Sequence, residues 1–72
     1  MVSLDVRPMM AEGREPFTEI MRTVELLRPG EEFELLAPLD PLPLYQVLAA
    51  QGFAHETQDI GGGDFRVVFR PS

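Results

Sequence analysis

Residues 29–43 read PGEEFELLAPLDPLP, and this stretch decides the fold. Its opening Pro-Gly pair ends a preceding helix, since neither residue continues one well. Residues 31–37 predict a strand whose alternate apolar positions share one face: Phe33, Leu35 and Ala37. Leu36 adds an apolar side chain to the other face. A strand that is apolar on both faces is more typical of the middle of a sheet than of its edge.

Three prolines follow within residues 38–43. Such a density also occurs in polyproline segments, but proline is well tolerated in the first turn of a helix. We therefore favour a helix with Asp40 as N-cap, its carboxylate accepting the Leu42 N–H because Pro43 has none to offer. The expected buried stripe of this helix has Tyr45 at its margin and consists of Leu44, Val47 and Leu48. Gly52 fits the left-handed position that ends a helix.

Upstream of this stretch, the sequence predicts a strand and a helix. Apolar and polar side chains alternate in residues 3–6, the period of a half-buried strand. Residues 7–15 keep no period and contain a proline and a glycine, so we expect a loop. Pro16 suits the first position of a helix that Pro29 and Gly30 end. Its apolar stripe has helical spacing: Phe17, Ile20, Met21, Val24 and Leu27.

Downstream, two strands are expected over residues 53–60 and 65–70, joined by the Gly-Gly-Gly-Asp hairpin loop of residues 61–64. The element order is therefore β-α-β-α-β-β. Strand–helix–strand crossovers are right-handed in nearly all cases, which makes the first two strands parallel. We predict an α/β fold, specifically an α+β two-layer sandwich with a four-stranded mixed sheet and two helices on one face. At this length the chain predicts a single domain, residues 1–72.

Charge and composition narrow the function classes. The chain has twelve acidic residues and six arginines, and the arginines are spread along the sequence. The resulting net charge of −6 disfavours binding to nucleic acid or to an anionic membrane. The absence of cysteine excludes disulfides, thiolate metal sites and cysteine nucleophiles. No apolar run approaches the roughly 20 residues that span a bilayer. No secretory signal is visible, so a cytoplasmic location is expected.

Isolated polar features give little support for catalysis. His55 is the only histidine, whereas metal sites need several converging ligands. Three glutamates lie near the start of the first predicted helix: Glu12, Glu15 and Glu19. The partial positive charge at a helix N-terminus favours acidic side chains there, which explains them without catalysis. The glycines of residues 61–63 lie between two strands, where no helix N-terminus could help them hold a phosphate. We expect no catalytic residue, no metal and no cofactor.

Five short motifs occur in order along the chain: Asp5-Val6-Arg7, Arg14-x-Pro16, Pro29-Gly30-Glu31, Asp40-Pro41-x-Pro43-Leu44-Tyr45 and Arg66-Val67. Together with the opening Leu4, they resemble the TusA/SirA sulfur-carrier superfamily over nearly the whole chain. The resemblance is closer to an uncharacterised TusA-like branch catalogued as domain of unknown function 2249. It implies the same β-α-β-α-β-β sandwich.

The chain also departs from that superfamily. TusA-like carriers place a cysteine in a Cys-Pro-x-Pro motif before the first helix, and the matching positions here are Gly13 and Arg14. Carriage of sulfur as a cysteine persulfide is therefore excluded. Members of the closer branch often have histidines at the positions of Glu15 and Leu39. The sequence leaves open whether these positions imply a lost metal site.

The sequence favours a non-enzymatic binding or adaptor module whose partner is another protein. Exposed methionines before the first helix would provide an adaptable contact surface. The candidate binding surface consists of Asp5, Arg7, Met9, Met10, Arg14 and Glu15. Asp5 and Arg7 could equally serve only to pin the loop by pairing with each other.

Two alternatives remain open. A small cofactor- or metal-handling protein, or an enzyme of sulfur or redox metabolism, would build its site from His55, Tyr45 and nearby acids. A homodimer is compatible with the far face of the sheet, where Leu36 and Val68 are expected among polar residues. The ligand, the partner and the pathway do not follow from the sequence.

Overall fold

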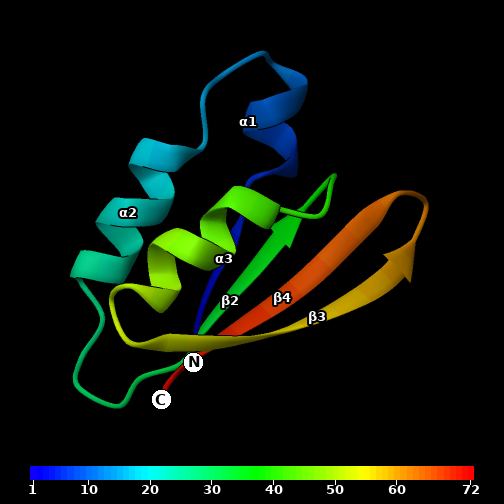
Figure 1. Ribbon diagram of the computed structural model, residues 1–72. Coiled ribbons are helices and arrows are strands. Elements are labelled where there is room, and N and C mark those ends of the chain that lie inside the picture. Colours follow the sequence, from blue (N-terminus) through cyan, green and yellow to red (C-terminus); the bar gives the residue numbers. More distant parts are fainter.

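The computed structural model describes residues 1–72 and shows a four-stranded sheet with helices over one face (Figure 1). The elements in chain order are β1 (Val2–Asp5), α1 (Arg7–Ala11), α2 (Phe17–Glu25), β2 (Phe33–Ala37), α3 (Leu42–Ala49), β3 (Phe53–Gly61) and β4 (Asp64–Pro71). The predicted α+β two-layer sandwich with a mixed sheet is confirmed. None of the helices has the length and apolar character needed to cross a membrane.

The strands lie in the order β1-β2-β4-β3. β1 and β2 are parallel, while β4 runs antiparallel to both β2 and β3. The central position of β2 agrees with its apolar pattern on both faces. β3 and β4 form the expected hairpin, whose turn is made by Gly62 and Gly63. Both have positive φ, as a two-residue type I′ turn requires.

The core lies between the sheet and the helices. On the helix-covered face, Phe33 of β2 is paired with Phe69 of β4, and Leu35 is paired with Val67. All four side chains are fully buried. The helices cover them with two buried residues from each of α2 and α3: Ile20, Val24, Leu44 and Leu48. Burial of each such side chain contributes about 1.5–3 kcal/mol, so these residues dominate the stability of the fold.

No helix covers the other face of the sheet, where charged side chains pair with one another. Glu34 accepts hydrogen bonds from Ser3 and Arg66, and these lower the pKa of its carboxyl. Val68 lies on β4 directly between Glu34 and Glu56, and only 3% of its surface is exposed. The expected apolar surface at Val68 is therefore absent, since its polar neighbours shield it from solvent.

The segment before α2 differs from the prediction. Residues 7–11 form the short helix α1 rather than a loop, so the structure has three helices instead of two. Pro8 lies in its first turn, where the missing N–H costs no hydrogen bond. Pro16 is the N-cap of α2 rather than its first residue. The helix ends at Glu25, earlier than predicted, and Leu26 beyond it is 76% exposed.

The start of α3 is helical, as predicted, but its cap is not the one expected. Pro41 is the N-cap, and the Leu42 N–H donates to the main-chain carbonyl of Asp40 at 2.8 Å. The Asp40 carboxylate instead accepts a hydrogen bond from the Tyr45 hydroxyl at 2.5 Å. The prediction of a side-chain cap was wrong because this phenol competes for the carboxylate. Val47 was also wrongly assigned to the buried stripe, since 39% of it is exposed.

Candidate binding site

An apolar pocket opens where α1, the start of α2, the end of β2 and the start of α3 meet. Its volume is about 250 Å³. Buried residues form its floor: Val6, Ile20, Leu35, Ala37, Pro41 and Leu44. More exposed residues form its mouth: Met10, Pro16, Phe17, Leu39 and Pro43. No charged or hydrogen-bonding side chain lines the pocket, so it suits an apolar group.

The starts of α2 and α3 border this apolar pocket, although the start of a helix normally exposes polar N–H groups. A helix N-terminus leaves N–H groups without partners inside the helix. Three lining residues, Pro16, Pro41 and Pro43, have no N–H at all. At the start of α2, the Glu15 carboxylate accepts hydrogen bonds from the N–H groups of Phe17 and Thr18. Proline and the Glu15 cap thus remove polar groups that would otherwise face the pocket.

Four of the six residues predicted from the sequence lie near this site. Met9 and Met10 are half-buried and both pack against the hydrophobic core, so neither is the fully exposed side chain that was expected; Met10 also lines the mouth of the pocket. Glu15 caps α2, and it also accepts a hydrogen bond from the Thr18 hydroxyl at 3.0 Å. Arg14 pairs with Glu12 at 3.6 Å, with both side chains largely exposed. This segment therefore provides an apolar wall with charged groups beside it.

The other two predicted residues have a different position and a structural role. Asp5 of β1 is paired with Leu36 of β2, and Leu36 is paired with Arg66 of β4. Paired residues share a face of the sheet, so Asp5 lies on the uncovered face. The Arg7 side chain donates two hydrogen bonds to the Asp5 carboxylate, at 2.8 and 2.9 Å, and one to Asp64 at 2.8 Å. The Arg7 main-chain N–H donates another to Asp5 at 3.0 Å. These bonds lower the pKa of Asp5 and raise that of Arg7. Arg7 thereby links the end of β1 to the start of β4.

A second cluster lies between α3 and β3. The rings of Tyr45 and His55 are stacked, with centroids 3.8 Å apart and planes inclined by 2°. The Tyr45 hydroxyl lies between Asp40 and Thr57 and is hydrogen-bonded to both. Burial raises the pKa of Tyr45 to about 12, with a further contribution from Asp40. The phenol is therefore protonated at neutral pH and acts as a hydrogen-bond donor.

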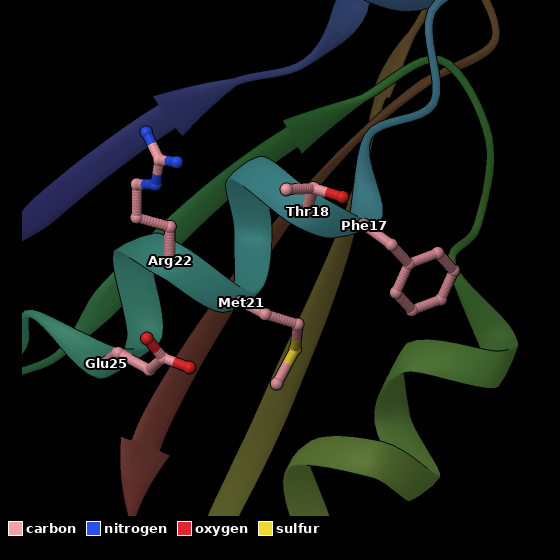
Figure 2. Close-up of a pocket in the computed structure, with 5 residues that line it drawn as sticks. All are labelled: Phe17, Thr18, Met21, Arg22 and Glu25. Carbon is pink, nitrogen blue, oxygen red and sulfur yellow. The ribbon is translucent and has the colours of Figure 1, made fainter.

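A shallow depression of about 430 Å³ lies along the outer side of α2 (Figure 2). Phe17 points from α2 toward the segment that enters α3, whereas Arg22 points to the opposite side of the helix. Phe17 borders both the depression and the apolar pocket. It was predicted as a core residue, yet 41% of it is exposed. The prolines at both helix starts are the only sequence signal that could have indicated the pocket.

A family model described as "Uncharacterized conserved protein (DUF2249)" matches residues 3–71. The chain belongs to the DUF2249 family. The match runs from β1 to the end of β4, so this DUF2249 domain includes the pocket and the Tyr45–His55 cluster. Searches of curated proteins and of solved structures found no match.

The residues that the DUF2249 resemblance singled out have identifiable positions. Leu39 lies at the mouth of the pocket, 45% exposed, and Glu15 caps α2 beside Pro16. Nowhere in residues 1–72 do three histidine, aspartate or glutamate side chains gather in a way that could hold a metal ion.

Proposed function

We propose that this DUF2249 chain is a non-enzymatic binding module that takes up an apolar group of another protein. The observation that carries the proposal is the pocket of about 250 Å³ lined only by apolar side chains. Protein interfaces are commonly anchored by an aromatic or aliphatic side chain in such a pocket, surrounded by a polar rim. Arg14 and Glu15 beside the pocket would contribute to that rim.

The chemistry of the lining supports binding rather than catalysis. Acid–base catalysis needs a proton donor or acceptor within hydrogen-bond reach of the reacting group. The pocket offers none, and the Glu15 carboxylate is engaged by α2. Met10 can adapt its side chain to different apolar groups. In this proposal Asp5, Arg7 and Met9 hold α1 in place, while Met10, Arg14 and Glu15 contact the partner.

The scaffold is part of the same proposal. The short motifs along the chain support a relationship to TusA/SirA-like sulfur carriers. The chain contains no cysteine, so it does not itself carry a persulfide. We propose that it acts in the cytoplasm as an adaptor on a carrier-like scaffold.

The pocket can be tested with indole as a small apolar probe. Titration of the ¹⁵N-labelled chain should shift amide resonances of the residues that line the pocket. Leu39→Asp places a carboxylate at the mouth and should weaken indole binding at least tenfold, because bound indole would cover this charge and remove water from it without supplying a partner. Leu26→Asp is the matched control, since Leu26 is exposed and does not line the pocket. Equal loss in both variants would contradict the assignment.

The partner can be tested by placing a photo-crosslinking amino acid at position 10 or at position 26. Crosslinks to one protein from position 10 alone would support the adaptor role, provided that Leu39→Asp abolishes them. Crosslinks of equal strength from both positions, or none from position 10, would refute it.

A second candidate function is a small cofactor- or metal-handling protein, or an enzyme, of sulfur or redox metabolism. It is favoured by the stacked pair of Tyr45 and His55 beside Asp40. Native mass spectrometry of the purified chain would reveal a bound metal or small molecule. Loss of that added mass in His55→Ala would support this candidate over the binding module.

A further inference from the structure

α3 has an exposed face without any charge. Residues 41–54 contain no acidic or basic side chain, although the whole chain has twelve acids and six arginines. α3 is the only helix or strand that lacks a charged residue. Its exposed positions, with Ala50 at the C-cap, are Leu42, Pro43, Gln46, Val47, Ala49 and Ala50.

These positions form one continuous face. At about 100° per residue they cover an arc of roughly 160°, on the side of the helix opposite to the buried Leu44 and Leu48. A helix that is apolar around most of its circumference is usually covered on both sides. Here the sheet covers one side of α3, and no other element covers the side that faces away from it (Figure 1).

We propose that α3 is a self-association surface, on which two copies of the chain pack helix against helix about a two-fold axis near Gln46. Charge argues for a second copy. Two chains of net charge −6 repel each other over a distance of about 10 Å at 0.1 M salt. A two-fold axis sets each patch against a copy of itself, so an uncharged face adds no like-charge repulsion at the contact of two acidic chains.

The side chains of the face suit this arrangement. Gln46 lies near the centre of the arc and is its only polar residue. Its amide both donates and accepts hydrogen bonds, so it can pair with the same amide across a two-fold axis. Ala49 and Ala50 are small and allow the two helix backbones to approach closely.

The area of the exposed α3 face limits the affinity of the dimer. A standard interface takes about 800 Å² from each partner, roughly a fifth of the 4459 Å² that this chain exposes (800/4459). α3 has eight residues and is about 12 Å long, which is too short to supply that area. We therefore expect a weak, reversible dimer, with a dissociation constant above the roughly micromolar upper end of standard-size interfaces.

This inference goes beyond the proposed function, and the two surfaces share only Pro43, which neither test changes. Binding at the pocket is read from indole-dependent shifts, whereas self-association is read from molecular mass. The chain could therefore fail to bind indole and still dimerise, or bind indole and remain a monomer.

The test is sedimentation equilibrium of the chain from 10 μM to 1 mM at 0.15 M NaCl. The average mass should rise from monomer toward dimer over this range. Gln46→Glu sets two carboxylates against each other and should raise the dissociation constant at least tenfold. Gln51→Glu is the matched control, because Gln51 is exposed but lies beyond α3. It makes the same change in charge and should leave the dissociation constant within twofold.

Charge complementation makes the test specific. Gln46→Lys alone should also remain monomeric, whereas an equimolar mixture of Gln46→Glu and Gln46→Lys should form a mixed dimer. A wild-type chain that stays monomeric at 1 mM would overturn the proposal. So would a dimer that Gln46→Glu does not weaken, because that dimer must use another surface.

Discussion

α2 and α3 lie side by side over the same face of the sheet, and each buries two residues (Figure 1). Their outer sides differ. α2 presents Thr18, Arg22 and Glu25 to solvent, whereas the exposed side of α3 has no charge. The polar side of α2 indicates that Ile20 and Val24 are buried, although Phe17 at the start of the same stripe is exposed. α3 lacks that contrast, so its apolar spacing did not separate the exposed Val47 from the buried Leu44 and Leu48. Periodicity identifies a buried face most clearly where the opposite face is polar.

The largest expected effect tests whether the buried residues of α2 and α3 contribute equally. Leu48 of α3 is fully buried, so Leu48→Ala should lower the free energy of unfolding by about 3 kcal/mol. Val24 of α2 is 8% exposed and smaller, so Val24→Ala should cost about half as much. Urea denaturation of both variants measures the difference. Equal losses would show that the inner side of α3 is no better packed than that of α2.

The next effect concerns how the two helices begin. Glu15 caps α2 through its carboxylate, so Glu15→Ala should cost about 1 kcal/mol. Asp40 does not cap α3 and bonds Tyr45 instead. In Asp40→Ala the amide exchange of the first turn of α3 should therefore be unchanged, while Glu15→Ala should speed exchange at the start of α2. Hydrogen exchange followed by NMR compares them, and faster exchange at Leu42 in Asp40→Ala would contradict the assignment.

Tyr45 allows a direct optical test on α3, because it is the only tyrosine and the chain has no tryptophan. Phenolate absorbance should rise with a midpoint near pH 12 in the folded chain, since burial and Asp40 raise the pKa of Tyr45 to about 12. In urea the midpoint should be about 10. A folded-state pKa above the unfolded one stabilises the fold at low pH, so this contribution is lost as pH rises from 10 through 12.

Asp40→Ala is the control for that titration. It removes one cause of the shift and should lower the folded-state midpoint, while the midpoint in urea should not change. A folded-state midpoint of 10 in the wild-type chain would show that Tyr45 is not held as described.

The smallest effect tests the exposed side of α3. Val47→Thr should change the free energy of unfolding by less than about 0.5 kcal/mol, because Val47 is partly exposed and lies outside the core. A loss above 1 kcal/mol in urea denaturation would restore Val47 to the buried stripe that the sequence predicted.

Much of the fold follows from local pattern, and the exceptions have identifiable causes. β2 was predicted as central because Leu36 makes it apolar on both faces, and a right-handed crossover makes β1 parallel to it. α1 has only five residues, too few for any helical period to become visible. The role of Asp40 was misjudged because its carboxylate is taken by Tyr45, five residues away in the sequence.

The candidate site was less accessible to prediction than the fold. The pocket is made where Met10, Pro16, Leu39 and Pro43 converge, and no local pattern reports that convergence. The sequence grouped Met10, Arg14 and Glu15 with Asp5 and Arg7, and left open that the last two only pair with each other. They do pair. The further bond from Arg7 to Asp64 joins residues from opposite ends of the chain, so no local pattern could indicate it.

The order of the strands determines when the protein can fold. β4 is the last strand in the chain, yet it lies between β2 and β3 and supplies Val67 and Phe69 to the core. During synthesis Phe33 and Leu35 therefore leave the ribosome before their partners Phe69 and Val67 do. Contacts between distant segments form slowly, and exposed apolar strands aggregate. The nascent chain is most vulnerable to aggregation in the interval before β4 emerges.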